Sequence, residues 1–532
     1  SAGCPKLSRP SLSKQRGSDD EAAQARVGAP GVSLPGDFSM TLSRRAFLRL
    51  AALAAAGVTA SACAPAYRFL AGAPRPIAAW PRDDAVFAAL NRLTFGPRPD
   101  ERLAAAEAGL AGWIEAQLAP ETIDDGATDL MLRRFPSLTM KAHELHAWSD
   151  KLFDDQDRAS APAELRQATL LRQIYSRRQL YEVMVEFWSD HFNISADKGD
   201  CFYLKTVDDR AVIRPHALGN FHDLLWASAH SPAMLVYLDQ HVSDRTRPNE
   251  NYARELMELH TLGVDGGYTQ IDVMELARCF TGWTVKEHWW RGEFTFDPDR
   301  HDDGVKTVLG ERIEPGGQAE AERVVERLAA HPGTARFIAR KLAARFLGPD
   351  APEALVGRAA RVFTDSGGDI RATLRPVLLD GVAPGALVPK FKRPVNFVVS
   401  ALRQLNAATD AGPPLLEVLR RLGQLPFGWP TPDGYPDHAE AWSGNLLPRW
   451  QFALALAEGA LPGTTVDLDG LLARAGARTP EEITDRLSEL LLGAPRPAAQ
   501  RAALLDVVGA AGDDLPRVLV AGLVASPEFQ WR

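Results

Sequence analysis

The chain has 532 residues, of which 45% are hydrophobic and 24% are charged. These proportions are ordinary for a globular protein, and they exclude a wholly disordered chain, a collagen, a disulfide-rich mini-protein and a multi-span membrane protein. The net charge of -8 at pH 7 gives no reason to expect nucleic-acid binding. At about 150 residues per domain, the length corresponds to two to four domains.

Residues 1–39 precede the first methionine, Met40, and are rich in Ser, Gly, Pro and Ala without apolar periodicity. Two interpretations remain open for this segment. It is either translated upstream sequence, with synthesis starting at Met40, or a genuine disordered extension. In both cases we expect it to lie outside the fold.

Residues 40–62 have the features of an export signal. The run Ser43–Arg49, SRRAFLR, matches the twin-arginine motif. The alanine-rich apolar run that follows, 50–62, is too short to span a bilayer as a permanent helix. The sequence therefore predicts export by the twin-arginine route to the periplasm.

The end of the signal, Ala-Ser-Ala-Cys at 60–63, fits two processing routes. Ala-x-Ala is an ordinary signal-peptidase site. The same residues resemble a lipobox, in which Cys63 becomes the lipidated N-terminus, although the usual leucine three residues earlier is missing. Residues 1–62 carry a net charge of +4, so the mature chain carries -12 over 470 residues. Such an acidic protein suits solubility in the periplasm, with membrane contact only through a lipid on Cys63.

The mature chain is predicted to have a linker over 63–80 and a helical domain over 81–530. Apolar residues recur at three-to-four spacing, for example in a long predicted helix over 163–192. The same spacing predicts helices over 251–262, 318–330, 333–346, 353–364, 370–379, 391–406, 415–423, 447–458, 467–475, 480–492, 497–510 and 514–525. We predict a mainly α fold, a large multi-helix body of one lobe or of two, 81–315 and 316–530.

The region 285–313 has a different pattern. Residues 293–296 alternate like a strand, residues 305–309 form a second short strand, and an acidic loop separates them. This predicts a small β-hairpin near 293–309. Further along, a Pro/Gly/Trp-rich loop is expected over 426–445, whose aromatic rings either stack on sugars or plug the end of the helical body.

The predicted helix 163–192 carries two features of interest. Glu182, Glu186 and Asp190 lie at i+4 steps, and such like charges repel each other unless they are paired. His191 ends the helix beside an apolar face, where a lone histidine is more often a satisfied core residue than a ligand.

One predicted helix concentrates polar residues. Asn251, Glu255 and Glu258 share a face of an α-helix, whereas Glu250, Arg254 and Glu258 stack at i+4 spacing. One interpretation is a surface ladder of ion pairs around Arg254. The other is a pair of inward carboxylates, which would need a metal or a bound arginine, because burying them without partners costs several kcal/mol.

His301 and Asp302 lie in the predicted hairpin loop. An imidazole and a carboxylate on a turn suit a hard-metal or general-base site, although Asp-Gly turns have the same composition. The predicted metal ligands are His191, Glu255, His301 and Asp302, and such a mixed N/O set suits Zn, Mn or Fe. The predicted catalytic residues are Glu255, Glu258 and His301, with Asn251 and Arg254 as further polar residues of the site.

Longer motifs over residues 83–529 resemble the DUF1800 family of bacterial proteins. They are Asn91–Pro97, His191–Asn193, Tyr237–Asp239, Asn249–Gly263, Ala277–Trp283, His301–Asp302 with Lys306, Lys392–Val395, Gly428–Pro430 and Ala525–Phe529. One departure is Arg393, where the family more often has serine. The family is one of unknown function, so the resemblance supplies no activity. It implies an envelope pathway, because members are often exported and often encoded beside DUF1501 proteins, which resemble sulfatases or phosphatases.

Two hypotheses about function follow. The first is an exported, metal-dependent envelope enzyme, hydrolase-like, that acts on a polymer or its fragments. In it the cation activates water, Glu255 or Glu258 is a ligand or general base, and His191 or His301 is a ligand or proton shuttle. The alternative is a non-catalytic helical scaffold that assembles with a DUF1501-type partner.

Overall fold

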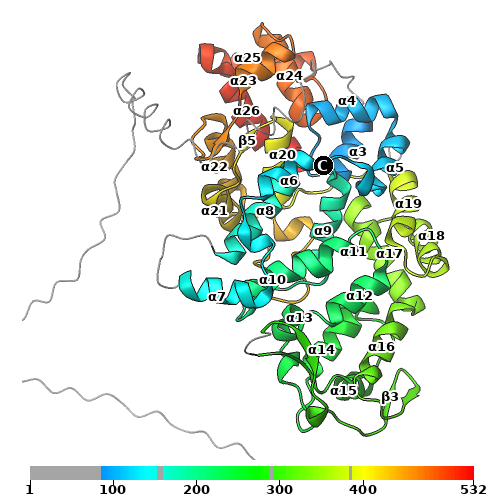
Figure 1. The fold of residues 1–532 in the computed structure, drawn as a ribbon. Helices are drawn as coiled ribbons and strands as arrows, with labels where there is room; N and C mark the ends of the chain where they lie inside the picture. Colours follow the sequence, from blue (N-terminus) through cyan, green and yellow to red (C-terminus); the bar gives the residue numbers. More distant parts are fainter. Residues whose placement is uncertain (1–84, 153–159, 288–290, 383–385) are drawn as a thin grey trace, which may run out of the picture. The chain divides into compact units, whose positions relative to one another are not determined.

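The computed structural model describes residues 85–152, 160–287, 291–382 and 386–532, which all belong to one compact unit (Figure 1). The predicted extension, export signal, Cys63 and linker lie outside the described residues. Within the described part, no helix is long and apolar enough to cross a membrane. The division into lobes 81–315 and 316–530 stays a prediction.

The fold is mainly helical, as predicted (Figure 1). The helices of the first half are α3 (Ala85–Leu93), α4 (Pro99–Ala108), α5 (Leu110–Leu118), α6 (Gly126–Leu132), α7 (Ala142–Leu152), α8 (Ala161–Tyr175), α9 (Gln179–His191), α10 (Cys201–Asp208), α11 (Arg214–His216), α12 (Phe221–Ala229), α13 (Pro232–Tyr237), α14 (Glu250–Glu255) and α15 (Gln270–Cys279). Those of the second half are α16 (Ala319–Ala329), α17 (Pro332–Leu347), α18 (Glu353–Asp365), α19 (Ile370–Gly381), α20 (Pro394–Gln404), α21 (Pro413–Arg421), α22 (Leu446–Ala457), α23 (Leu468–Arg474), α24 (Pro480–Leu492), α25 (Ala498–Val508) and α26 (Leu515–Ala525). The helices predicted after residue 316 all form, with bounds that shift by a few residues.

The single helix predicted over 163–192 is in fact two helices, α8 and α9. The break is fixed by the Asp125 carboxylate, which accepts hydrogen bonds from Ser176 Oγ at 2.7 Å and from the Arg177 backbone N–H at 3.0 Å. Gln179 Nε2 donates to the Ser176 carbonyl at 2.9 Å. Polar side chains therefore satisfy the backbone where the helix stops, while the apolar spacing continues across the break.

Among the described residues, three small antiparallel sheets accompany the helices. Their strands pair as β1 (Trp283–Val285) with β2 (Phe294–Phe296), β3 (Lys306–Val308) with β4 (Glu311–Ile313), and β5 (Ala408–Thr409) with β6 (Thr464–Thr465). Both strands predicted near 293–309 form, but their predicted pairing with each other is wrong. Leu309 and Gly310 have φ of 49° and 75°. Two such residues make a tight two-residue turn, which joins β3 to β4 and leaves β2 to pair with β1.

The helix predicted over 251–262 changes its winding midway. It starts as α14 and continues as the π-helix η5 (Leu256–Thr261). In a π-helix each backbone hydrogen bond spans five residues instead of four. Residues beyond Glu255 are therefore rotated about the helix axis, away from the face that they would share with Asn251 in an α-helix. Asn251 is exposed, whereas Glu255 and Glu258 are half-buried. Short π-helical segments are rare and often occur at functional sites.

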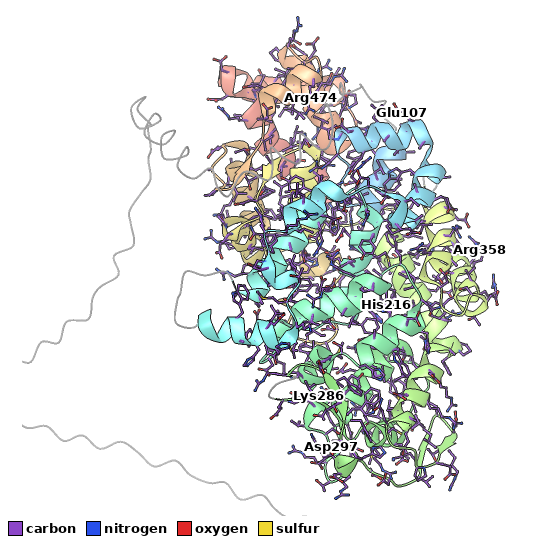
Figure 2. The ribbon with its side chains drawn as sticks, in the orientation of Figure 1. Glu107, His216, Lys286, Asp297, Arg358 and Arg474 are labelled. Carbon is purple, nitrogen blue, oxygen red and sulfur yellow. The ribbon has the colours of Figure 1, made fainter. Side chains whose placement is uncertain are left out.

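One continuous apolar core, which includes the fully buried Trp188 and Trp283, connects helices from α3 to α26. Charged side chains such as Glu107, Lys286 and Arg358 are exposed (Figure 2). Cys201 and Cys279 are buried free thiols. Because α8, α9, α17 and α20 all contribute to this core, polar groups on their remaining faces are held in fixed positions.

Candidate functional site

Helix α9 carries the three predicted like charges, Glu182, Glu186 and Asp190, one turn apart on one face. Their repulsion is relieved because each one has a guanidinium partner. For Glu182 the partner is Arg214, whose Nη1 lies 3.1 Å from Glu182 Oε1. The stripe is therefore a set of paired carboxylates rather than a solvated face.

Arg393 is the main partner of the other two carboxylates. Its Nη1 donates to Asp190 Oδ2 at 2.7 Å, and its Nη2 lies 2.8 Å from Glu186 Oε1. Arg345 donates to the second oxygen of Glu186. Both arginine side chains are only 3% exposed, so these charges depend on each other for stability. The hydrogen bond from Arg393 uses Oδ2 of Asp190, and the Asp190 side chain is 21% exposed, so Oδ1 is open to solvent or a ligand.

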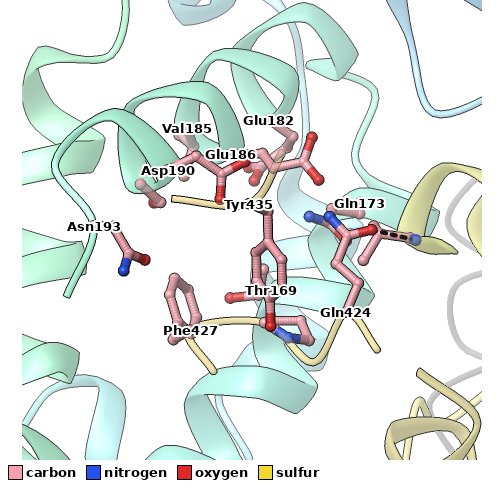
Figure 3. A pocket seen from close by; sticks show the side chains of 13 residues that line it. Thr169, Gln173, Glu182, Val185, Glu186, Asp190, Asn193, Gln424, Phe427 and Tyr435 are labelled. Carbon is pink, nitrogen blue, oxygen red and sulfur yellow. Dashed lines mark hydrogen bonds between the residues drawn. The ribbon is translucent and has the colours of Figure 1, made fainter. Parts of the chain in front are cut away.

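A small pocket with about 30 Å³ of free space lies beside this stripe (Figure 3). Helices α8, α9 and α20 form part of its wall, and the aromatic loop after α21 forms the rest. In Figure 3 the carboxylates of Glu186 and Asp190 lie on the α9 side, and the rings of Phe427 and Tyr435 come from the loop. Its free space suits a single small polar group rather than a whole ligand, and its wall mixes carboxylates, amides and aromatic rings.

Three buried polar atoms at the wall of the pocket have no hydrogen-bond partner among the described residues. They are Thr169 Oγ1, Gln173 Oε1 and Ser189 Oγ, and the three residues are 6%, 3% and 8% exposed. A buried polar group without a partner costs about 1–3 kcal/mol, and native proteins rarely leave one unsatisfied. Together with Asp190 Oδ1, these acceptors and hydroxyls suit a ligand that donates hydrogen bonds.

The aromatic loop is fastened to the end of α9 through its backbone. Asn193 Nδ2 donates to the Thr431 carbonyl at 2.7 Å, and Tyr237 Oη donates to the Pro430 carbonyl at 2.8 Å. Gly434, with φ of +75°, packs directly against the backbone of Asp190. The rings of Phe427, Tyr435 and Trp442 are mostly buried, as expected if they plug the helical body.

Two titratable groups near the pocket have pKa values displaced toward neutrality. Burial raises the pKa of Asp190 to about 6; the charge of Arg393 opposes this shift and that of Glu186 adds to it. Burial also lowers the pKa of Lys341 on α17 to about 8, although Asp190 favours its charged form. Groups shifted in this way are typical of sites that transfer protons.

His191 is a buried core histidine, 2% exposed, and both of its ring nitrogens are engaged. Its Nδ1 lies 2.8 Å from Lys341 Nζ, and its Nε2 lies 3.1 Å from the His260 carbonyl. Because an ammonium only donates and a carbonyl only accepts, Nδ1 is the acceptor and Nε2 carries the proton. Burial and the Lys341 charge lower the pKa of His191 well below its usual value, so the ring is neutral.

His301 lies in a separate buried cluster with Glu320 and Lys306. Its Nδ1 is 2.8 Å from the Thr281 carbonyl, and its Nε2 is 3.1 Å from Glu320 Oε1. Lys306 pairs with the other oxygen of Glu320. All three side chains are at most 1% exposed, so this cluster has the form of a structural ion pair.

Asp302 and Arg254 are paired with other side chains. Asp302 Oδ2 lies 2.8 Å from Arg278 Nε, and this hydrogen bond lowers the pKa of Asp302 to about 2. Arg254 Nη2 lies 3.6 Å from Glu250 Oε2, as the ion-pair interpretation of this helix predicts.

Glu255 differs from the other predicted residues, because it has no hydrogen bond or ion pair among the described residues. It is half-buried, and burial raises its pKa, with the charges of Glu258 and Asp433 adding to the shift. Glu258 accepts a hydrogen bond from Tyr268 Oη at 3.4 Å.

Across the described ranges, no group of three or more His, Cys, Asp or Glu side chains is placed to hold a metal ion. Of the four predicted ligands, three are engaged by protein groups and only Glu255 has an unpartnered carboxylate. The shared metal site therefore gains no support from this arrangement and stays a prediction.

Sequence reasoning missed most of the pocket. The spacing of Glu182, Glu186 and Asp190 was the available signal, because such a stripe on an otherwise apolar helix requires guanidinium partners. No sequence pattern indicated that the pocket would be lined by Thr169, Gln173 and Ser189, because a single polar residue in an apolar helix belongs to no recognisable motif.

A family model described as "Protein of unknown function (DUF1800)" matches residues 88–531. The chain belongs to the DUF1800 family. No curated protein and no solved structure gave a match. Three of the segments that carry the resemblance to DUF1800 proteins, His191–Asn193, Tyr237–Asp239 and Gly428–Pro430, meet where the aromatic loop is fastened to α9. The pocket is thus built where distant family motifs come together.

Proposed function

We propose that this DUF1800 protein is an exported envelope enzyme that binds a polyhydroxylated polymer at the pocket beside α9, with one hydroxyl group of the polymer inside the pocket, and hydrolyses it. The proposal rests on the unpartnered buried polar atoms at the pocket, Thr169 Oγ1, Gln173 Oε1 and Ser189 Oγ. They lie beside the Asp190 carboxylate, whose side chain is 21% exposed. Hydroxyl groups of a sugar both donate and accept hydrogen bonds, so they complement such a wall.

Asp190 is the residue we assign to proton transfer. Arg393 holds one of its oxygens at 2.7 Å, which fixes the carboxyl group and leaves the other oxygen for the ligand. Hydrolysis needs one group that protonates the leaving oxygen and one that accepts a proton from water, and a carboxyl group serves in either role. Lys341 and Glu186 supply the charges that surround Asp190.

Metal dependence remains a separate prediction of the same hypothesis. Glu255, whose carboxylate has no partner among the described residues, is the predicted ligand that is free to bind a cation. Metal analysis of protein isolated from its native compartment tests this, with Glu255→Ala as the variant that is expected to lose the metal.

A binding and hydrolysis assay on neutral, amino and acidic polysaccharides tests the proposed function. Asp190→Asn is expected to lower the rate of hydrolysis at least about 100-fold, because it removes the proton-transfer group. Thr169→Val is expected to weaken ligand binding by about 2- to 12-fold, which corresponds to the loss of one hydrogen bond.

The control for this assay is Asp223→Asn, at a carboxylate whose side chain is 62% exposed. It should leave both rate and binding unchanged. Wild-type rates in the Asp190→Asn and Thr169→Val variants, on a polymer that the wild-type enzyme cleaves, would contradict the proposal.

We also propose that the protein reaches the periplasm by the twin-arginine route. Replacing both Arg44 and Arg45 by lysine is expected to leave the precursor in the cytoplasm, because the route recognises the arginine pair. Cell fractionation and immunoblotting measure this. Normal periplasmic levels of the double-lysine variant would refute the route, and fractionation of Cys63→Ser shows whether a lipid holds the protein at the membrane.

One observation favours the alternative, a scaffold for a DUF1501-type partner. Helix α22 exposes Leu447, Trp450 and Leu454, at 62%, 48% and 51%, on positions i, i+3 and i+7. A row of exposed apolar side chains is typical of protein contacts. If this face binds such a partner, Trp450→Glu should abolish co-elution of the two purified proteins. Val507→Glu, at a position 80% exposed on α25, is the control. Absence of co-elution with the wild-type chain would reject the alternative.

A further inference from the structure

A second charged cluster surrounds the Asp437 carboxylate, and we call its members Arg345, Lys390, Arg393, Asp437 and Arg532 the Arg532 cluster. Lys390 Nζ donates to Asp437 Oδ2 at 2.6 Å. Arg345 Nη1 and Arg393 Nε lie 3.9 Å and 4.0 Å from Asp437 Oδ1, which is beyond hydrogen-bond distance. The Asp437 carboxylate therefore does not accept hydrogen bonds from these two arginine nitrogens, although their charges surround it.

Buried donors outnumber acceptors in this cluster. The unpartnered nitrogens are Nε and Nη1 of Arg345, Nε of Arg393 and all three guanidinium nitrogens of Arg532. The unpartnered acceptor of the cluster is Asp437 Oδ1. Arg345 and Arg393 are 3% exposed, so bulk solvent does not supply the missing partners. Each buried guanidinium donor without an acceptor costs free energy, more than a neutral group would.

Positive side chains also outnumber negative ones in this region. The positive side chains of the Arg532 cluster are Arg345, Lys390, Arg393 and Arg532, and the negative ones that pair with them are Glu186, Asp190 and Asp437. Arg92 lies beside the cluster, where it donates to backbone oxygens of Phe346, Val388 and Arg532. Burial lowers the pKa of Arg92 to about 10, although the Asp437 charge opposes the shift. Burial and the charge of Arg345 lower the pKa of Arg532 as well. An additional negative charge would relieve both the repulsion and the missing hydrogen bonds.

We propose that the Arg532 cluster binds a small oxyanion, a sulfate, phosphate or carboxylate group, between Arg345, Arg393 and Arg532. Guanidinium groups present paired N–H donors whose geometry matches such oxygens, and hydrogen bonds between them are stronger than neutral ones. The oxyanion is either a free ion or an acidic substituent of a polymer in the neighbouring pocket, because Glu186 and Asp190 line that pocket and also pair with Arg393. The binding does not depend on the hydrolysis proposed above.

The test is a titration of the full chain with sodium sulfate at constant ionic strength, followed by thermal unfolding and by calorimetry. Wild-type protein is expected to bind one sulfate and to show a saturable rise in unfolding temperature, because a ligand that binds only the folded state stabilises it. Arg532→Met, at a side chain with no hydrogen bond to lose, should fold and lose the saturable rise.

Arg421→Met, at a side chain 65% exposed, is the control and should keep the sulfate response. Tighter binding of sulfate than of glucose 6-sulfate would support a free ion, and the reverse order would support a polymer substituent. A wild-type response no larger than that to chloride, or an equal saturable response in Arg532→Met, would overturn the proposal. Neither result would bear on hydrolysis in the pocket.

Discussion

Gly434→Ala is expected to destroy the pocket beside α9. Gly434 has φ of +75°, a conformation that costs an alanine about 1–2 kcal/mol. Its Cβ would lie 2.8 Å from the carbonyl carbon of Asp190, 3.0 Å from the Asp190 Cα and closer still to the Asp190 oxygen. Because these are backbone atoms inside a helix, the loop must move away.

We expect two results from this substitution. The free energy of unfolding should fall by roughly 2–4 kcal/mol, which places it among the large effects of single substitutions. Hydrolysis should fall at least about 100-fold, since a displacement of about 1 Å at a catalytic group has that effect. Urea unfolding measures the first and the polysaccharide assay measures the second.

The matched control is Gly444→Ala in the same loop. No atom lies within 4 Å of the Cβ that this substitution adds, and Gly444 does not have a positive φ. It should change stability by less than about 0.5 kcal/mol, as surface substitutions generally do. If Gly434→Ala behaved like this control, the close packing of the loop on α9 would be wrong.

Arg393→Met is expected to be the most destabilising single change near the site. It removes the only hydrogen-bonding partner that Asp190 has among the described residues and one of the two cations beside Glu186. Breaking a buried ion pair by removing one partner typically costs about 3–5 kcal/mol, because the remaining charge stays buried. Denaturant unfolding measures the loss.

A second variant separates charge from packing. In Arg393→Met with Asp190→Asn, one of the stranded charges is gone, so part of the lost stability should return. Arg421→Met, on the surface, should cost less than about 1 kcal/mol. A loss below 1 kcal/mol in Arg393→Met itself would mean that the two carboxylates do not depend on this arginine.

The helical architecture was predictable because apolar residues at three-to-four spacing indicate helices directly. Helix α24, for example, has the bounds 480–492 that the spacing predicted. The failures have local causes. Asp125, which is distant in the sequence, accepts a hydrogen bond at the interruption between α8 and α9 and so separates the two helices. Leu309 adopts a positive φ, which its residue type does not suggest.

The candidate site was predictable only in part. The stripe of carboxylates on α9 was visible from its i+4 spacing, but Arg345 lies 159 residues from its partner Glu186, and no local pattern connects them. His191 was predicted as a metal ligand and weighed as a core residue, and it lies in the core with both ring nitrogens engaged by protein groups. His301 was placed with the metal ligands, and its contact with Glu320 comes from the packing of α16, which spacing does not reveal.

A crystal structure of Asp190→Asn with a bound oligosaccharide would show directly whether the pocket beside α9 binds a polyhydroxylated ligand. The variant is used because it should bind the fragment without cleaving it. We expect a sugar hydroxyl to occupy the pocket and to make hydrogen bonds with Thr169, Gln173 and Ser189. A fragment bound elsewhere on the chain, with these three side chains untouched, would contradict it.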